Sequence, residues 1–371
     1  MNIGFDAKRA FCNTRGLGNY SRDTIRIMSH LASDHRYFLF TPKQSLTFDY
    51  NSDNTQLIKP QTYFDKTFPA LWRTVGQTAD IRQQNLTVFH GLSHELPVGI
   101  EKTNTKSVVT MHDLIFLKYP QLFPWIDRQT YKRKYQRSCR VANHIIAASY
   151  QTKADLVNLW NIDEQRITVV YQGCNPMYHQ TCSPDAILKI KQTYHLPQNY
   201  ILNVGAIERR KNQELIIRAL ALSNRAIPLV IVGNATDYIN TLQRLIQELN
   251  LQSSVIFLTN VVTSDLPALY QGADLFVYPS LFEGFGIPIL EALSSRVPVI
   301  ASSGSCLSEV GGQQSLYVNP HDVEALANAM VSVLDDERLR QQMINEGTKH
   351  TAHFSDAHIV QQLLSVYQSV L

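Results

Sequence analysis

Cysteine is scarce in this sequence, and its spacing argues against disulfides and structural zinc. The 371 residues include five cysteines, and no two of them form a C-x-x-C pair. A disulfide framework or a zinc site normally requires cysteines paired at close spacing. We therefore expect reduced thiols that are mostly buried. The five are Cys12, Cys139, Cys174, Cys182 and Cys306.

Long apolar runs are also missing. No segment approaches the roughly 18 consecutive apolar residues that are needed to cross a bilayer. The amino terminus carries Asp6, Lys8 and Arg9 where a secretion signal would need an apolar stretch. We expect a cytoplasmic protein, and a peripheral contact with the inner membrane face is a further hypothesis.

No low-complexity segment or short repeat interrupts the chain, and 44% hydrophobic with 18% charged residues is typical of a globular enzyme. A chain of this length is too long for one ordinary core, so two domains are expected. Short β-rich runs alternate with amphipathic helical stretches, which is typical of parallel sheets covered on both faces. We predict an α/β fold with two Rossmann-like, doubly wound domains.

The predicted domain boundary lies in a proline-containing segment without a convincing strand. We assign residues 1–175 to the N-terminal domain and 176–352 to the C-terminal domain, with 176–199 as the linker region. Residues 353–371 should form a helix, because apolar residues recur there at helical spacing. These residues are Ile359, Leu363, Val366 and Val370.

The net charge of +3 conceals a difference between the two halves. Residues 1–200 hold 24 basic and 15 acidic side chains, whereas residues 201–371 hold 10 and 16. A basic half indicates an anionic partner. Much of the excess lies in a predicted helix at 128–140. The basic residues of this helix either form a solvated face or attract anionic lipid. In the second case each basic group near the membrane would contribute about 1 kcal/mol of binding free energy.

Ligands of doubly wound sheets bind beyond the carboxyl ends of the strands, and the first such junction contains Gly16 and Gly18. Backbone without side chains can approach a ligand closely, and a helix that begins near Asn19 would point its amides at it. A simple turn is the alternative. A dinucleotide fingerprint is disfavoured because Ser21 stands where a third glycine is needed.

Two histidines end strands of the first half. His112 closes a β-rich run in Thr110–Asp113, and it could donate a hydrogen bond to a sugar hydroxyl or to a developing negative charge. His90 ends another run, and we expect it to line the same cleft. A lone histidine at a strand end is more often structural, so both interpretations stay open.

Arg210 and Lys211 follow the first strand of the second half, beside the amino end of a helix for which Asn212 is a plausible cap. A guanidinium and an ammonium at such a position suit a diphosphate. They would stabilise the charge that grows on a departing nucleotide diphosphate. Ordinary surface charge is the alternative.

The most informative junction is Glu283-Gly-Phe-Gly-Ile-Pro-Ile-Leu-Glu291, which follows an apolar strand. Pro288 suits the first turn of a helix, so Glu283 should lie in the loop and Glu291 about one turn inside the helix. Gly284 and Gly286 leave backbone amides open between them. Two carboxylates could then bracket one ligand, and Glu291 could accept hydrogen bonds from a ribose.

Together these motifs resemble a large family of retaining GT-B glycosyltransferases, glycosyltransferase family four (group 1). The family includes many bacterial mannosyl- and glucosyltransferases of cell-surface polysaccharide synthesis. The most specific match is the Glu283–Glu291 block. The supporting segments are Gly16–Gly18, Thr110–Asp113, Glu208–Asn212, Pro298–Ser302 and His353–Ser355. The resemblance implies two Rossmann-like domains that face each other across a cleft, with residues 353–371 crossing back to the first domain.

The resemblance also implies a role for each site residue. Catalysis would involve His112 and Glu283. The donor diphosphate would contact Gly16, Gly18, Arg210 and Lys211. The donor sugar and ribose would contact Gly284, Phe285, Gly286 and Glu291. Val261 would lie near the nucleobase.

Four departures from the family pattern concern the donor. Arg15 replaces a further glycine, and Ala206 replaces an arginine that some relatives place on the phosphate. Residues 259–260 and 172–175 also differ from common motifs, so the choice between UDP and GDP stays open.

The expected activity is retaining transfer of a hexose from a UDP- or GDP-sugar to a glycan or lipid-linked acceptor. No metal or other cofactor and no nucleic-acid partner is expected. A nucleotide-sugar epimerase and a non-catalytic sugar-nucleotide binding subunit are the alternatives. Mechanism and roles are carried over by analogy with the family.

Overall fold

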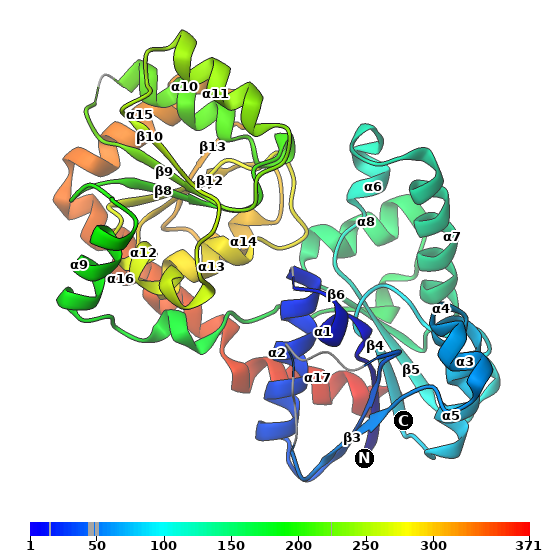
Figure 1. Ribbon diagram of the computed structural model, residues 1–371. Helices are drawn as coiled ribbons and strands as arrows, with labels where there is room; N and C mark the ends of the chain where they lie inside the picture. The colour runs from blue at the N-terminus through cyan, green and yellow to red at the C-terminus, as the bar shows by residue number, and fades with distance from the viewer. Residues whose placement is uncertain (15, 44–47, 49–51, 224) are drawn as a thin grey trace. The chain divides into compact units, whose positions relative to one another are not determined.

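The computed structural model describes residues 1–14, 16–43, 48, 52–223 and 225–371. The chain divides into two compact units (Figure 1). Unit 1 comprises Met1–Gly173 and Phe354–Leu371, and unit 2 comprises Cys174–His353. No helix within the described ranges is long and apolar enough to cross a membrane.

Unit 1 is built on a parallel sheet. Its described residues form seven strands in the order β3-β2-β1-β4-β5-β6-β7. The strands are β1 (Asn2–Asp6), β2 (Arg36–Phe40), β3 (Thr55–Ile58), β4 (Val88–Gly91), β5 (Lys106–Met111), β6 (His144–Ala147) and β7 (Ile167–Val169). The strand order reverses between β1 and β4, and such a reversal opens a crevice for ligands at the carboxyl ends of the strands.

Helices cover both faces of this sheet (Figure 1). They are α1 (Lys8–Cys12), α2 (Gly16–Leu31), α3 (Tyr63–Thr67), α4 (Pro69–Leu71), α5 (Gln77–Gln83), α6 (Ile115–Lys118), α7 (Trp125–Val141), α8 (Tyr150–Trp160) and α17 (Asp356–Ser369). A π-helical segment, η1 (Trp72–Gly76), precedes α5, and short 3-10 helices are η2 (Ile100–Lys102), η3 (Pro120–Leu122) and η4 (Glu164–Arg166). Because strand side chains alternate between faces, Val88 and Phe89 enter different apolar clusters.

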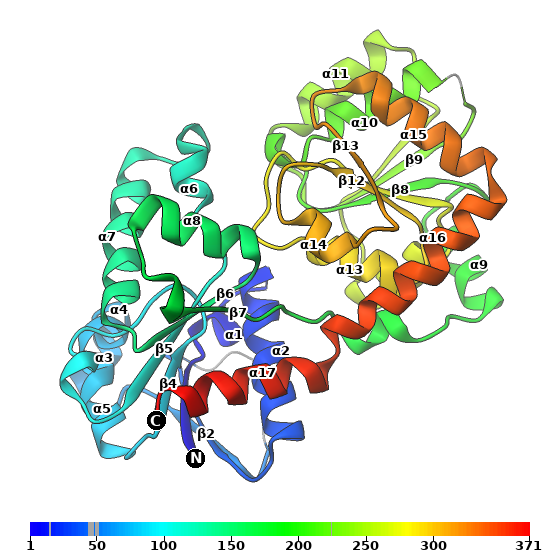
Figure 2. The same cartoon turned by 180° about the vertical axis from the view of Figure 1, so that it is seen from behind.

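The last helix, α17, completes the core of unit 1 by packing across α2 (Figure 2). Ile359 and Leu363 are buried in the cluster that contains β1 and α2. The Tyr367 hydroxyl lies 2.7 Å from Nδ1 of His90, whose Nε2 lies 2.7 Å from the Thr110 hydroxyl. His90 is therefore buried beneath α17, and the expectation that it lines a ligand cleft is wrong.

Unit 2 repeats the architecture. Its described residues form six parallel strands in the order β10-β9-β8-β11-β12-β13. The strands are β8 (Ile201–Val204), β9 (Leu229–Val232), β10 (Val255–Leu258), β11 (Leu275–Tyr278), β12 (Val299–Ser302) and β13 (Leu316–Val318). The order reverses between β8 and β11, so the loops after these two strands flank the expected ligand crevice.

The helices of unit 2 are α9 (Pro184–Thr193), α10 (Gln213–Ser223), α11 (Ile239–Glu248), α12 (Leu266–Gln271), α13 (Ile287–Ser294), α14 (Leu307–Gly311), α15 (Val323–Asp335) and α16 (Glu337–His350). Its short turns are η5 (Pro176–His179), η6 (Arg209–Lys211), η7 (Thr263–Asp265) and η8 (Thr351–Phe354), which ends in unit 1. The predicted linker region thus holds η5 and α9. Two parallel, doubly wound sheets confirm the predicted fold class.

Candidate active site

In unit 2, two loops at the strand-order reversal are tied together by hydrogen bonds. The loop after β8 turns through η6 and reaches Asn212, whose backbone is left-handed at φ 58°. The Asn212 side-chain amide donates to the carbonyl of Pro279 at 3.1 Å and to that of Pro320 at 2.8 Å. The Leu281 amide donates to the Arg210 carbonyl at 2.9 Å. The asparagine therefore joins both loops as well as preceding α10.

These loops bring Arg210, Lys211 and Glu283 into one cluster. Oε1 of Glu283 lies 2.7 Å from the Lys211 ammonium and 2.8 Å from the Arg210 guanidinium. The Tyr278 hydroxyl, at the end of β11, accepts from Lys211 at 2.6 Å and donates to Glu283 at 3.1 Å. Two basic side chains from one loop thus meet a carboxylate from the other, as the sequence motifs had placed them.

The electrostatics of the cluster are set by its ion pairs. Burial opposes ionisation of Glu283, but Lys211 and Arg210 outweigh it and lower the pKa of this carboxyl to about 2. Arg210 also pairs with Glu208 at 2.7 Å. Two cations therefore face two carboxylates. The sequence did not predict these ion pairs. It suggested two unpaired cations that could bind a diphosphate, whereas both cations pair with carboxylates in the structure.

The glycine-containing loop after Glu283 is fixed by its packing. Gly286 has φ 109°, a conformation that side chains disfavour, and a Cβ atom there would lie 2.7 Å from Leu307. The Cys306 thiol donates to the carbonyls of Glu283 and Phe285. The Phe285 side chain is buried, whereas Gly284 is half-buried. Helix α13 begins immediately after this loop, as predicted.

Glu291 lies one turn inside α13, where its carboxylate accepts a hydrogen bond from the Tyr270 hydroxyl at 2.9 Å. Tyr270 contacts Phe276 at a centroid distance of 5.3 Å, and Phe276 stacks on Tyr278 at 5.9 Å. An aromatic run therefore links Glu291 to the cluster around Glu283. Val261 is half-buried and follows β10, two strands away from β8 in the sheet.

In unit 1 the glycine pair lies inside a helix rather than in the preceding loop. Helix α2 begins at Gly16, three residues earlier than expected. A Cβ atom at Gly18 would lie 1.8 Å from the Asn13 carbonyl oxygen, so this glycine is required by the close approach of α1 and α2. Gly16 has open space around its Cα. Arg15 lies outside the described residues.

His112 is buried at the end of β5, and its Nε2 lies 2.9 Å from the Leu92 carbonyl. A carbonyl only accepts, so Nε2 carries the proton. Burial lowers the pKa of His112 to about 4, against a smaller opposite effect of this hydrogen bond. The neutral ring then keeps a lone pair on Nδ1. At neutral pH His112 is thus suited to accept a hydrogen bond from a sugar hydroxyl, whereas the sequence suggested a donor.

Sequence reasoning missed several residues around the strand-order reversal of unit 1. His94 has φ 65°, stacks on Tyr135 at a centroid distance of 4.5 Å, and accepts from the His112 amide at 3.1 Å. Asp6, at the end of β1, pairs with the buried Arg73 at 2.6 Å. The predicted strands around positions 2–5 and 87–90 could have pointed to these residues, because the side chains that follow neighbouring parallel strands meet at one edge of the sheet.

The part of the chain that the structure describes contains no group of three or more His, Cys, Asp or Glu side chains that could hold a metal ion.

Comparisons with known proteins identify the family. The model "Glycosyl transferases group 1" matches residues 187–350, and "Glycosyltransferase Family 4" matches residues 16–177. The chain is 31% identical over 287 residues to the O-antigen chain mannosyltransferase B of Escherichia coli, covering 76% of this chain and 74% of that protein. It is 29% identical to the O-antigen chain mannosyltransferase RfbU of Salmonella typhimurium, covering 76% and 73%.

Solved structures agree on the fold. The Anabaena protein HepE, solved in complex with UDP and glucose, matches all of this chain and all of its own with a TM-score of 0.80 at 20% identity. A sucrose-phosphate synthase from Thermosynechococcus elongatus matches with a TM-score of 0.78 at 22% identity, covering 100% and 99%. The chain therefore belongs to the group 1 glycosyltransferases of family 4 and has their two-domain GT-B fold.

Proposed function

We propose that this glycosyltransferase transfers a hexose from a nucleotide diphosphate sugar to a glycan or lipid-linked acceptor in the synthesis of a cell-surface polysaccharide. The single observation that carries the proposal is the cluster of Arg210, Lys211 and Glu283 at the strand-order reversal of unit 2. The comparisons support the proposal in two ways. Two relatives are O-antigen mannosyltransferases, and HepE was solved with UDP and glucose. These relatives do not favour the epimerase alternative.

In this proposal Lys211 and Arg210 contact the donor diphosphate. Glu283 holds both cations in place before the donor arrives. The more exposed Glu208 can leave Arg210 when the diphosphate supplies its own negative charge. The two cations would then stabilise the charge on the departing nucleotide diphosphate without a metal ion.

The remaining residues orient the sugar. Glu291 would accept hydrogen bonds from the ribose, with Tyr270 fixing its carboxylate. Glu283 and the backbone amides of Phe285 and Gly286 would face the transferred sugar, and Nδ1 of His112 would accept from one of its hydroxyls. The bond from the anomeric carbon to phosphate breaks, and the acceptor oxygen bonds to the same face. Bond formation on the same face gives retention, and the leaving phosphate takes the acceptor proton.

Replacing Lys211 by alanine is expected to weaken binding of the nucleotide diphosphate at least about tenfold, because the charge-assisted contact is lost. Thermal-shift and calorimetric titrations with UDP, GDP, UDP-glucose and GDP-mannose measure it. A ligand at 100 times its Kd stabilises a folded protein by about 2.7 kcal/mol, so the preferred nucleotide is read directly from the wild type.

The matched control is Lys189→Ala, which removes an exposed lysine of the same unit. Equal UDP and GDP affinities in Lys211→Ala, Lys189→Ala and the wild type would exclude the phosphate role. Absence of transfer by the wild type with every donor and acceptor would instead count against the proposed activity as a whole.

A peripheral contact with anionic membrane is a further part of the proposal. Helix α7 begins with Trp125 and Ile126, which are 65% and 70% exposed, and continues with the exposed Lys132 and Arg133. Exposed aromatic and aliphatic side chains beside basic ones are typical of an interfacial helix. Two other basic residues of α7, Lys134 and Arg137, contribute less, because they pair with Glu95 and Glu101.

Vesicle co-sedimentation is the measurement for this contact. The protein should bind vesicles that contain phosphatidylglycerol, and Trp125→Ser with Ile126→Ser should reduce binding several-fold through lost apolar burial. Leu188→Ser, on an exposed position of unit 2, is the control. Equal binding by both variants would place any membrane contact elsewhere.

A further inference from the structure

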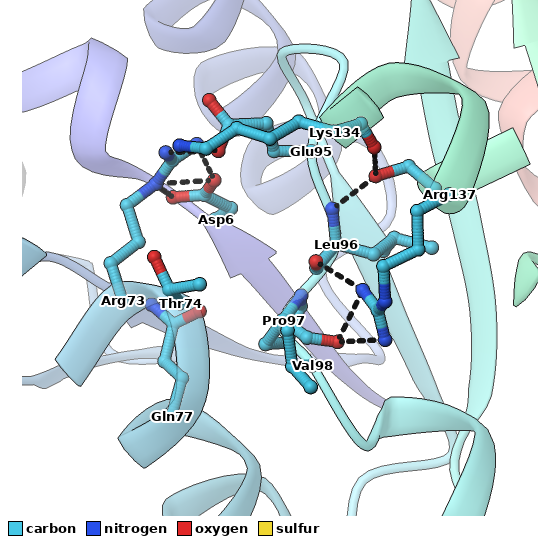
Figure 3. A pocket seen from close by; sticks show the side chains of 11 residues that line it. Asp6, Arg73, Thr74, Gln77, Glu95, Leu96, Pro97, Val98, Lys134 and Arg137 are labelled. Atoms are coloured by element: carbon cyan, nitrogen blue, oxygen red, sulfur yellow. Dashed lines mark hydrogen bonds and ion pairs between the residues drawn. The ribbon is translucent and has the colours of Figure 1, made fainter. Parts of the chain in front are cut away.

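Unit 1 holds a small polar pocket at its own strand-order reversal (Figure 3). Asp6, which ends β1, and Glu95, which follows β4, line it together with Arg73, Gln77 and Lys134. Its volume is about 40 Å³. At roughly 10–15 Å³ for each water-sized group, the pocket has room for about three or four hydroxyl-sized groups. It lies at the edge of the sheet where doubly wound domains bind their ligands.

The charged residues of this pocket pair with one another and with Glu101. Arg73 contacts Asp6 at 2.6 Å, where both side chains are buried, and Glu95 at 3.0 Å, where the carboxylate is partly buried. Lys134 also pairs with Glu95, at 3.2 Å. The Arg137 guanidinium pairs with Glu101 and donates to the Leu96 and Pro97 carbonyls. Each cation of the lining is thus paired with a carboxylate, one of which, Glu101, lies outside the lining.

Gln77 gives the pocket a second, independent feature. It is 1% exposed, and neither its amide nitrogen nor its amide oxygen has a hydrogen-bond partner among the described residues. In Figure 3 its side chain extends from the start of α5 toward Arg73 and Thr74. A buried amide without partners is costly in a folded protein. A hydroxyl group, which both donates and accepts, would satisfy the nitrogen and the oxygen together.

We infer that this pocket binds hydroxyl groups of a neutral saccharide, which is the acceptor of the transfer reaction. The identification of the ligand as the acceptor rests on the proposed function, and the chemistry of its recognition rests on Glu95 and Gln77. Asp6 already accepts from the Arg73 guanidinium and from the Lys8 amide. Glu95 keeps acceptor capacity beyond its contacts with Arg73 and Lys134, because a carboxylate has about four lone-pair sites.

The test compares Gln77→Met with Gln83→Met, which makes the same change at an exposed position of the same helix. Ligand-observed NMR with methyl α-mannopyranoside and methyl α-glucopyranoside reports binding without any donor. At least one glycoside should bind the wild type and Gln83→Met, and Gln77→Met should lose most of that signal. In transfer assays Gln77→Met should raise the acceptor KM about tenfold and leave the donor KM unchanged.

Thermal unfolding checks that the variant is folded. Gln77→Met should melt at the same temperature as the wild type or higher, because methionine removes two buried polar atoms that lack partners. An unchanged acceptor KM together with undiminished glycoside signals would overturn the inference. A lower melting temperature with normal acceptor binding would also overturn it and would assign Gln77 to folding alone. Glycoside binding without transfer would preserve the pocket and reject the proposed activity.

Discussion

Glu283→Gln is expected to slow sugar transfer at least about 100-fold while the affinity for the free nucleotide diphosphate stays equal or increases. The amide keeps the shape of the side chain but loses the charge that orders Lys211 and Arg210. Both cations then become more available to the diphosphate. The carboxylate that would face the sugar is gone. Steady-state kinetics and calorimetry with UDP and GDP measure the two effects separately.

The same substitution should lower the free energy of unfolding by about 3 kcal/mol, because a mostly buried ion cluster loses one partner. Glu214→Gln is the matched control. Its carboxylate pairs with Arg218 on an exposed helical face, where such a pair contributes less than about 1 kcal/mol. Wild-type kcat/KM in Glu283→Gln would show that Glu283 does not act on the sugar, and equal stability of both variants would contradict the assigned ion cluster.

Unit 1 is expected to lose stability steeply between about pH 6 and pH 4. Burial lowers the pKa of His90 to about 3 and of His112 to about 4, and it lowers the pKa of His94 well below its usual value. In the unfolded chain each histidine titrates near pH 6.5. The unfolded state therefore binds more protons in this window, so the free energy of unfolding falls as pH falls.

Each histidine contributes about 1.4 kcal/mol per pH unit within the window, or about 4 kcal/mol per pH unit for the three. Asp23 offsets about one histidine, because burial raises the pKa of this carboxyl to about 6 and the folded state binds its proton first. Protonation of Glu283, whose pKa is lowered to about 2, reduces stability only below the usual glutamate range. Urea unfolding at a series of pH values measures the net slope. His90→Gln should reduce this slope by about half, and the exposed His321→Gln should not change it. A flat profile from pH 7 to pH 5 would contradict the buried, neutral histidines.

The architecture of unit 2 and the position of its site could be predicted because local sequence determines both. The apolar run of β11 marks a buried strand, the glycines after Glu283 mark a tight loop, and Pro288 marks the first turn of a helix. Parallel strands end at one edge of the sheet, so residues that follow β8 and β11 must lie close. The meeting of Lys211 with Glu283 follows from this rule.

The properties that could not be predicted depend on partners far away in the sequence. His90 and His112 both end strands, but α17 covers His90 and the Leu92 carbonyl fixes the proton of His112. Gly18 allows two helices to approach closely. In sequence, a glycine of this kind cannot be distinguished from a glycine in a ligand-binding loop. The pocket around Gln77 depends on the ion pair between Arg73 and Asp6, and no local sequence pattern predicts this pair.

The return of α17 to the first unit has a consequence for synthesis of the chain. Unit 2 is continuous, so a nascent chain holds all of it once residue 353 has left the ribosome. Unit 1 is still incomplete at that time, because Ile359, Leu363 and Tyr367 are missing from its core. Throughout translation of the second unit, the nascent first unit exposes an apolar surface that favours aggregation and chaperone binding. A stop codon within codons 354–371 would therefore destabilise unit 1, most of which is synthesised before unit 2.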